Sequence, residues 1–516
     1  MSRDDGIGRR RFMEMSASTL VAAGAADLLG CAAAPVKPGR GGAIGYFSRF
    51  GITEEVLRQV LAAAMSRGAD LADVFVQHRV GGTMTLEDGA VNRASTGVSL
   101  GAGVRAVKGD QTGYGYTEEL TPAALVAAAR TAATIADGPS RPGPVTLHVA
   151  PPVATRYPLV RPWEEVRPDE KLPLIVALEQ RAFAADPRIR KVNVHLRDES
   201  GVVLIADSRG RIVEDRQPMT LLSLSCVAEQ DGRREQNGYN VAARAGFEYY
   251  TPDRLDRVVR EAIDRTTILF EAGAPPAGEL PVVLAAGSSG ILLHEAIGHG
   301  MEADFNRKGT SIYADKIGKR IAAPFVNIVD DGTQPGARGS INVDDEGNAA
   351  GQTRLVEGGV LTTFLHDEIS ARHYGVAPTG NGRRESYRHA PLPRMRSTYM
   401  LPGPHSRDEI IRSVKRGLYC VGFSNGQVAI GAGDFTFYVK NGWLIEDGKL
   451  TRPVKDVNLV GNGPKALEKV DMVGDDLQID EGGWTCGKDG QSVPVSQGLP
   501  TVRVASMTVG GRGSGR

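Results

Sequence analysis

The segment Ser288–Asp304, with the sequence SSGILLHEAIGHGMEAD, constrains the fold of this chain more than any other. An apolar run leads into His294 and Glu295, and His299 follows five positions after the first histidine. On a regular α-helix, residues four apart differ by about 40° in azimuth, whereas residues five apart differ by about 140°. A regular helix therefore cannot direct both imidazoles at one ion. A π-type turn, or a helix that breaks just before His299, would bring the rings together, and Gly298 is the natural place for that irregularity.

Two imidazoles beside a carboxylate are typical of a divalent metal site with a general base next to it. The HExxxH spacing is one residue longer than that of the HExxH zinc proteases. The alternative is that both histidines lie on a buried helix that holds no metal. Spacing alone leaves both interpretations open, so other segments of the chain have to decide between them.

The length and charge of the chain limit the class of protein to which it can belong. The 516 residues allow about two to four domains with a sizeable core. The chain carries 61 acidic and 61 basic side chains, so its charge gives no reason to expect nucleic acid as a ligand. The chain has 64 glycines, and some of them form turn-like pairs with an aspartate, as at 88–89, 231–232 and 447–448, which favour β-hairpins.

Residues 1–34 resemble an export signal. Arg9–Met13 is similar to a twin-arginine motif, and Leu20–Leu29 is apolar but too short to span a bilayer. The tetrapeptide Leu28–Cys31 is similar to a lipoprotein box, in which Cys31 would become lipidated. We therefore expect a periplasmic or membrane-anchored protein that contacts the membrane only through lipid at Cys31. The alternative is a disordered tail on a cytoplasmic protein.

The other three cysteines do not form CxxC pairs, so the sequence indicates no zinc ribbon. Cys226 and Cys420 lie in strand-like runs and are expected to be small buried apolar residues. They would form a disulfide only if the fold brought them together. Cys486 differs, because it lies in the glycine-rich loop Gly482–Lys488.

The pattern of elements predicts an α+β fold with two domains. Residues 47–275 mix helices and antiparallel strands without the regular alternation of a doubly wound sheet. The boundary is predicted in the proline- and glycine-rich stretch Ala272–Pro281. Residues 276–516 are mostly short strands, typical of a barrel or sandwich that carries the metal-site helix.

Individual elements follow from periodicity and from turn and cap residues. The predicted helices are one capped by Thr53 and ending at Gly68, then Thr121–Ala136, Asp169–Ala185, Thr251–Glu271 and Arg407–Gly417. The predicted strands are Val74–Val80, Thr83–Glu87, Gly97–Lys108, Lys191–Leu196, Val202–Ala206, Thr220–Ala228 and Val282–Ala286.

Two loops of the C-terminal half are unusual in charge. The acidic turns Asp330–Gly332 and Asp344–Gly347 are interpreted as solvated hairpins. The stretch Gly380–Tyr399 is predicted to be a long loop, and it carries five arginines.

Several long motifs, in this order along the chain, resemble a known family. They are HEAIGHGMEADFNRK at 294–308, TGNGRRESY at 379–387 and CGKDGQSVP at 486–494, followed by the closing segment 506–511. With LEDG at 86–89, the likeness extends from about residue 47 to the end. The chain resembles the TldD-type subunit of the TldD/PmbA family of bacterial metalloproteases, once described as modulators of DNA gyrase.

The resemblance implies an HExxxH metal site whose third protein ligand is Cys486. It also implies proteolysis of small or unfolded peptides, an α+β N-terminal domain and a β-rich C-terminal domain. Family members commonly pair with a homologous subunit that lacks the metal motif. We therefore expect a homodimer, or a heterodimer with a metal-less homologue.

On this basis we predict one zinc ion per active subunit, held by His294, His299 and Cys486. Two imidazoles and a thiolate suit zinc, and three protein ligands leave a fourth position open, as catalysis requires. Glu295 is predicted to be the general base that takes a proton from water and later delivers it to the leaving amine. Glu302 is a candidate for orienting an imidazole, and the alternative is an exposed carboxylate at a helix end.

The candidate substrate-binding residues are Asn381, Arg383 and Arg384, because arginines hold peptide carbonyls or a terminal carboxylate through charge-assisted bonds. Equally, the two arginines could form structural ion pairs with Glu385 or with the acidic turns. Two rival functions remain at this stage: an idle peptide-binding or assembly subunit with a structural metal, and a metal-dependent amidohydrolase of a small molecule.

Overall fold

The computed structural model describes residues 45–511, apart from residues 145, 152, 154, 158 and 430. The predicted export signal at 1–34, including Cys31, lies outside the described residues. Within the described part, no helix has the length and apolarity that a membrane crossing requires.

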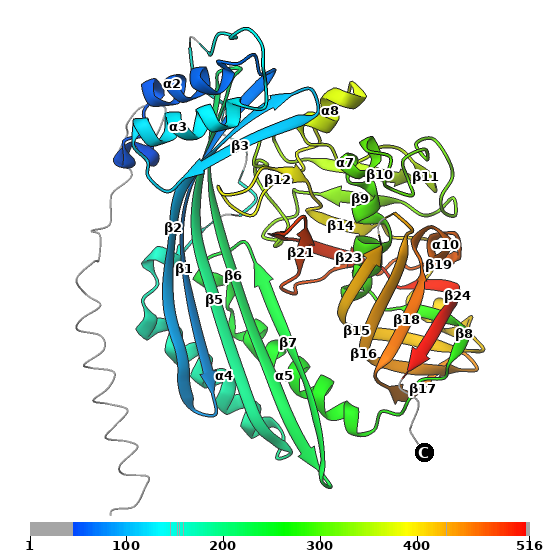
Figure 1. Cartoon of the computed structure of the whole chain (residues 1–516). Coiled ribbons are helices and arrows are strands. Elements are labelled where there is room, and N and C mark those ends of the chain that lie inside the picture. Colours follow the sequence, from blue (N-terminus) through cyan, green and yellow to red (C-terminus); the bar gives the residue numbers. More distant parts are fainter. Residues whose placement is uncertain are drawn as a thin grey trace, which may run out of the picture. The chain divides into compact units, whose positions relative to one another are not determined.

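The first half is built on one sheet of long strands, in the order β3-β2-β1-β5-β6, with β4 and β7 also paired to β6 (Figure 1). Its strands are β1 (Leu71–Glu87), β2 (Ala90–Lys108), β3 (Gln111–Thr117), β4 (His148–Val149), β5 (Ile189–Asp207), β6 (Arg211–Gln230) and β7 (Arg233–Ala243). Its helices are α2 (Glu54–Met65), α3 (Pro122–Ala133), α4 (Pro168–Ala185) and α5 (Pro252–Thr267).

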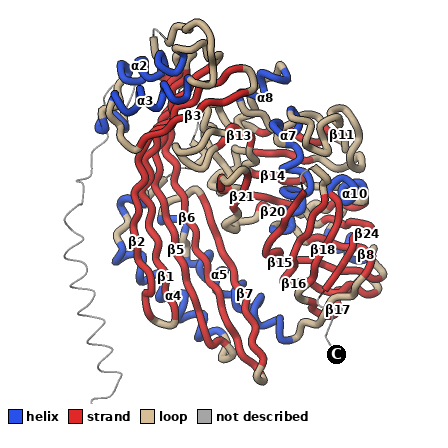
Figure 2. Tube along the Cα trace, viewed as in Figure 1, coloured by secondary structure: helices blue, strands red, loops and turns tan. Residues whose placement is uncertain are grey.

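The helices form two pairs on this sheet. Helices α2 and α3 pack on each other and on β1, β2 and β3, whereas α4 and α5 pack on β5, β6 and β7 (Figure 2). The predicted cap at Thr53 is confirmed, because its side chain accepts a backbone N–H of the first helical turn. Thr121 and Thr251, at which two other helices were predicted to begin, cap α3 and α5 in the same way. A shared apolar core that includes Leu178, Leu224 and Ile263 joins α4 and α5 to the strands, so amphipathic helices cover the sheet as expected.

The aspartate–glycine pairs make tight hairpin turns, as predicted. Asp88 and Gly89 have φ values of 49° and 81°, and Asp231 and Gly232 have 51° and 74°. Positive φ at both central residues is the geometry whose twist matches that of the flanking strands.

Several predicted elements were too short or too long. Val74–Val80 and Thr83–Glu87 are one strand, β1, because Gly81 and Gly82 pair with β2 on one side and β5 on the other. The strands predicted at 191–196 and 202–206 likewise join into β5. The helix predicted at 407–417 is shorter in the structure. It ends at Arg412 as α9 (Arg407–Arg412), because the chain from Arg416 onward is a strand that pairs with β8 and β16.

The second half contains a closed barrel. Strands β15-β8-β24-β18-β16 follow one another, and β15 also pairs with β16, which closes the ring. These strands, with the flanking β17 and β19, are β8 (Gly278–Leu284), β15 (Arg416–Ala429), β16 (Asp434–Glu446), β17 (Lys449–Val454), β18 (Val457–Asn462), β19 (Val470–Val473) and β24 (Val502–Gly511). A β-rich C-terminal half within an α+β chain is thus confirmed.

A second sheet and short helices accompany the barrel. The sheet has the order β11-β10-β9-β14-β23-β20, and two small ribbons pair β12 with β13 and β21 with β22. The strands are β9 (Ile328–Asp331), β10 (Gln352–Glu357), β11 (Val360–Leu361), β12 (Gly382–Arg383), β13 (Leu392–Pro393), β14 (Ser397–Met400), β20 (Gln478–Ile479), β21 (Thr485–Lys488), β22 (Gln491–Pro494) and β23 (Ser496–Leu499). The helices are α6 (Ile291–Leu293), α7 (Ala303–Arg307), α8 (Glu368–Tyr374), α9 and α10 (Gly463–Glu468).

The acidic turns are buried, so their interpretation as solvated hairpins was wrong. Asp330 is fully buried, and its Oδ1 accepts Arg396 Nε at 2.7 Å. Asp344 and Glu346 are also buried, and Glu346 lies 2.7 Å from Arg105 of β2. Arginines far away in the sequence supply the countercharge for Asp330 and Glu346, which the local sequence could not reveal. Asp344 instead accepts the backbone N–H groups of Glu346, Asn348 and Gly382.

Cys226 and Cys420 are small buried apolar residues, as predicted. They belong to different apolar cores, and neither forms a disulfide with another described residue. Burial raises the pKa of each thiol to about 12, so both remain unreactive.

Candidate metal centre

The HExxxH segment contains a π turn. The chain runs from the short helix α6 into a π-helical turn, η7 (His294–Gly298), and then into a 3₁₀ turn, η8 (His299–Met301). The backbone N–H of His299 donates to the carbonyl of His294, five residues earlier. The predicted i→i+5 turn is confirmed, and its wider winding places the two histidines on one side of the helical segment.

Gly298 has a packing role in this turn. Its φ of −56° is ordinary for a helix, so the glycine is not required by the backbone angles. A Cβ at this position would instead overlap the sulfur of Met395, which is fully buried against the turn. The π segment is therefore pressed against the loop that leads into β14.

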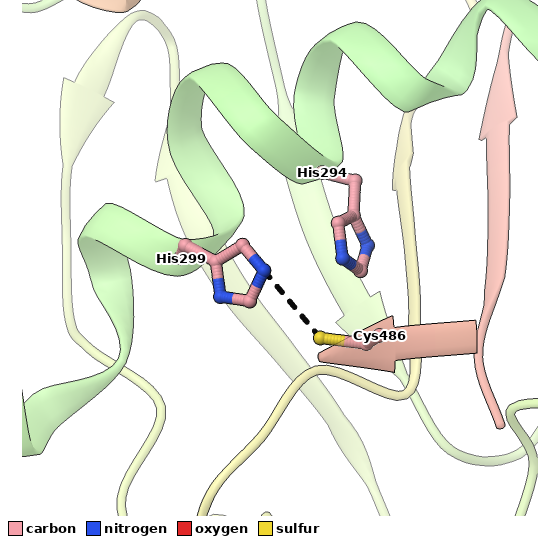
Figure 3. A group of neighbouring side chains, drawn as sticks. All are labelled: His294, His299 and Cys486. Carbon is pink, nitrogen blue, oxygen red and sulfur yellow. Dashed lines mark hydrogen bonds between the residues drawn. The ribbon is translucent and has the colours of Figure 1, made fainter. Parts of the chain in front are cut away.

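Cys486 on β21 completes a cluster with the two histidines (Figure 3). Its Sγ lies 3.5 Å from Nε2 of His299, and one ligand atom of each residue lies within 4.8 Å of the other two. The two imidazoles are 5.0 Å apart at their centres and nearly perpendicular. All three side chains are buried, so this is an enclosed set of donors rather than a chance surface group.

The chemistry of this donor set fits a zinc ion. His294 Nδ1 is buried and has no hydrogen-bond partner among the described residues. Burial alone would raise the pKa of the Cys486 thiol, but the imidazoles of His294 and His299 lower it well below its ordinary value. Two imidazoles and a thiolate are ligands that zinc prefers.

Glu302 lies directly behind His299. Its Oε2 accepts a hydrogen bond from His299 Nδ1 at 3.0 Å, and the carboxylate is fully buried, which excludes the exposed interpretation. Lys488 Nζ lies 3.1 Å from Glu302 and 2.7 Å from Asp304. Burial opposes ionisation of Glu302, yet Lys488 and His299 hold its pKa at about 2. Glu302 therefore fixes the orientation of the His299 ring, leaving Nε2 directed at Cys486.

Glu295 faces a cleft beside the cluster. The cleft has a volume of about 620 Å³, and it is lined by the three candidate ligands, Glu295 and part of β15. Burial raises the pKa of Glu295, whereas the neighbouring imidazoles act in the opposite direction. A Cβ at Gly426 would lie 3.3 Å from Glu295 Cγ, so a glycine on β15 leaves room for this side chain.

Three parts of the chain match domain models of one protein family. Models of three PmbA/TldA metallopeptidase domains match: domain 1 at residues 72–136, the central domain at 161–270 and the C-terminal domain at 277–511. A metalloprotease TldD homolog from Haemophilus influenzae is 39% identical over 467 residues, which are 89% of this chain and 97% of that protein. The chain belongs to the TldD/PmbA family.

Other members of the TldD/PmbA family are more distant. A zinc metalloprotease TldD homolog from Saccharolobus solfataricus is 30% identical over 344 residues, which are 66% of this chain and 76% of that protein. The solved structure of a Thermotoga maritima protein has a TM-score of 0.71 at 22% identity, covering 89% of this chain and 100% of that one. TldE from Thermococcus kodakarensis has a TM-score of 0.69 at 19% identity, covering 89% and 99%. These two structures support the fold alone.

In this TldD/PmbA protein the candidate substrate-binding residues are buried, and they bind other groups of the protein. Asn381 donates to Asp330, and Arg383 donates to the carbonyls of Met395 and Pro494. Arg384 lies 3.3 Å from Asp73, on the first half of the chain. The contacts of both arginines are structural, but no described carboxylate of Glu385 or of the acidic turns forms an ion pair with them, as the sequence-based alternative expected. Both arginines also border a cavity.

Lys488 is the site residue that sequence reasoning missed. It is two residues after Cys486 on β21, so both side chains lie on the same face of the strand. The spacing of two residues between Cys486 and Lys488 was visible in the sequence. Its partners Glu302 and Asp304, however, are nearly two hundred positions away, and only the fold shows that a buried cation is needed there.

Proposed function

We propose that this chain is a zinc-dependent peptidase with an active site formed by His294, His299, Cys486 and Glu295. The observation that carries the proposal is the π turn, which gathers both histidines around a buried cysteine and leaves Glu295 facing the cleft. The name of the Haemophilus relative, a metalloprotease, and that of the Saccharolobus relative, a zinc metalloprotease, support it.

Each residue of the proposed site would have a separate role in the reaction. His294, His299 and Cys486 would hold the ion, which supplies Lewis-acid polarisation of the scissile carbonyl when bound. Glu295 takes a proton from the attacking water on a carboxylate oxygen and delivers it to the leaving amine. Glu302 and Lys488 hold the His299 ring in position.

The metal is tested by removing and restoring it. We expect a chelator to abolish cleavage of a short unstructured peptide and added zinc to restore it. His299→Ala and Cys486→Ala should lose zinc in metal analysis, whereas the control Cys420→Ala, which changes a buried cysteine elsewhere, should keep it. Full zinc occupancy in both ligand variants would contradict the assignment.

The general base is tested separately from the metal. Glu295→Gln should keep zinc and lower kcat by about 10²–10⁴-fold, the usual contribution of a positioned base. Glu468→Gln, an exposed change on α10, is the control and should keep full activity. Undiminished turnover in Glu295→Gln would remove Glu295 from the mechanism.

We further propose that the substrate is a small or unfolded peptide bound in extended form. Glycine-rich strand edges beside the cleft suit main-chain pairing, which selects weakly among side chains. A folded protein should resist cleavage, whereas its unfolded fragments should be degraded. Equal cleavage of both would argue against a peptide-only site.

Two rivals are separated by the same assays. An assembly subunit with a structural metal would bind zinc but cleave no peptide, and Glu295 would have no catalytic role in it. An amidohydrolase of small molecules would need zinc and Glu295 but leave peptides intact. The three donors with a cleft beside them favour a catalytic site, because structural zinc sites usually have four protein ligands.

Assembly and location are also proposals. We propose a dimer, with itself or with a metal-less homologue, and export followed by lipid attachment at Cys31. Light scattering of the purified chain, alone and with co-expressed homologues, tests the first. Fractionation of cells that express wild type and Cys31→Ser tests the second, and full-length wild type in the soluble cytoplasm would overturn it.

A further inference from the structure

A second cavity adjoins the metal centre and is rich in arginine. It has a volume of about 420 Å³ and lies between β5 and β6 of the first half and the β21–β22 ribbon of the second. Thr485, the residue before Cys486, lines both this cavity and the active-site cleft. Because neighbouring Cα atoms are about 3.8 Å apart, the two spaces meet within one residue of a candidate metal ligand.

Three of the arginines that line this cavity have no carboxylate partner. Arg244, Arg338 and Arg383 form no ion pair with any described residue, although Arg244 and Arg383 are buried. Four carboxylates border the cavity, and each has another partner. Asp198 pairs with Lys171 at 2.7 Å, and Glu199 lies near Arg79 and Arg197. Asp345 and Glu385 accept the backbone N–H groups of Arg384 and Ser492. A buried charge without an ion-pair partner is costly, so two buried arginines beside the half-buried Arg338 at one cavity require an explanation.

The protein contacts of these arginines use only part of each guanidinium. Arg244 Nε donates to the carbonyl of Arg338, and Arg338 Nε donates to the carbonyl of Trp484. The terminal nitrogens of Arg244 and Arg338 donate no hydrogen bond to a described residue and are not completely buried, and the Arg244 guanidinium lies 5.6 Å from the centre of the Tyr157 ring. Those of Arg383 donate to the carbonyls of Met395 and Pro494. Burial and the positive charge of Arg244 lower the pKa of Arg338 to about 10 and that of Arg383 to about 9. A bound anion would relieve this repulsion.

We propose that this arginine cavity binds a carboxylate of the peptide substrate and thereby positions the chain across the metal centre. The inference rests on the proposed peptidase function. Guanidinium groups hold carboxylates through paired, charge-assisted hydrogen bonds, and the cavity has room for the end of a peptide. The carboxylate is either the C-terminal group or an acidic side chain, and the chemistry of recognition is the same for both.

Binding measured without turnover tests the proposal. In the zinc-loaded Glu295→Gln background, fluorescence anisotropy would compare three labelled hexapeptides: one with a free C-terminus and no acidic side chain, its C-terminal amide, and the amide with one glutamate near its end. The free acid should bind about 10–100-fold more tightly than the amide, as expected for bonds to a charged group. Tight binding of the glutamate peptide would show that a side-chain carboxylate also serves.

The arginine variants decide whether the cavity is responsible. Arg244→Gln combined with Arg338→Gln keeps a donor at each position but removes both charges. It should weaken binding of the free acid to the level of the amide and leave the amide unchanged. The control, Arg260→Gln, changes an exposed arginine on α5 and should alter neither. Equal binding of acid and amide by wild type, or equal weakening of both by the double variant, would overturn the inference.

The two proposals fail in distinguishable ways. If the wild-type protein with zinc cleaves none of the peptides while the anisotropy pattern holds, the peptidase proposal fails and the carboxylate site stands. If the peptides are cleaved at the same kcat/KM with and without a carboxylate, the peptidase proposal stands and the carboxylate site fails.

Discussion

At the scale of single residues, Lys488 is the most consequential side chain around the metal centre that touches no candidate ligand. It is buried, and its ammonium group lies within 3.1 Å of Glu302 and 2.7 Å of Asp304. The pKa of Lys488 is raised by these carboxylates, even though burial opposes it. The lysine therefore neutralises two buried acids, one of which holds His299.

Removing this charge should destabilise the fold. Lys488→Met leaves Glu302 and Asp304 buried without their cation, and we expect the free energy of unfolding to fall by about 3–5 kcal/mol. Adding Asp304→Asn should recover part of this loss. Urea unfolding followed by circular dichroism measures both, with the exposed change Lys449→Met as control. A loss below 1 kcal/mol would mean that water, not protein, surrounds the two carboxylates.

At the scale of elements, the π turn decides whether the HExxxH motif forms a site. The sequence contains one more residue between the histidines than a regular helix can use. The turn absorbs that residue, and Gly298 lets it pack against Met395. Gly298 is thus required by packing and not by the backbone angles.

A double-mutant cycle tests this packing. Gly298→Ala should lower the free energy of unfolding by about 1–3 kcal/mol, because the new methyl group overlaps the Met395 sulfur. In a Met395→Ala background the same change should be neutral or stabilising by up to about 1 kcal/mol, since alanine favours helix over glycine. Thermal unfolding measures the cycle, and Gly351→Ala, where nothing lies within 4 Å, is the control. Additive effects would show that the two residues do not touch.

At the scale of the whole molecule, a buried ionic cluster joins the two halves of the chain. Arg105 on β2 lies 2.6 Å from Asp73 and 2.7 Å from Glu346, and each of these side chains is at most 3% exposed. Arg384 lies 3.3 Å from Asp73 and 2.9 Å from the carbonyl of Asp345. Since the arginine cavity is also lined from both halves, this cluster holds together the walls of the proposed substrate site.

Arg105→Gln tests that connection. It leaves Glu346 buried without its ion-pair partner and Asp73 with Arg384 alone, so the free energy of unfolding should fall by about 3–5 kcal/mol. The control is Arg141→Gln, which breaks a surface pair with Asp70 and should cost at most about 1 kcal/mol. Calorimetry would follow both. If Arg105→Gln cost no more than the control, the cluster would not join the halves energetically.

Much of the organisation of this protein was determined by the sequence alone. Local rules are sufficient where the cause is local: a threonine capped the first helix, and aspartate–glycine pairs formed the hairpin turns. The five-residue spacing of His294 and His299 limited that segment to a π turn or a break in the helix, and the π turn is present. The family motifs marked Cys486 as the third member of the cluster before the fold was known. Each of these signals lies within a few residues of the feature it predicts.

The tertiary structure decided what depends on distant partners. It joined β1 across two glycines, because strands on both sides satisfy the backbone there. It buried the acidic turns, since Arg105 and Arg396 come to them from other elements. It also left Arg244, Arg338 and Arg383 around one cavity without an ion pair to any carboxylate of the described residues. Burial and countercharge are set by packing between residues far apart in the chain, and composition or periodicity carries no record of them.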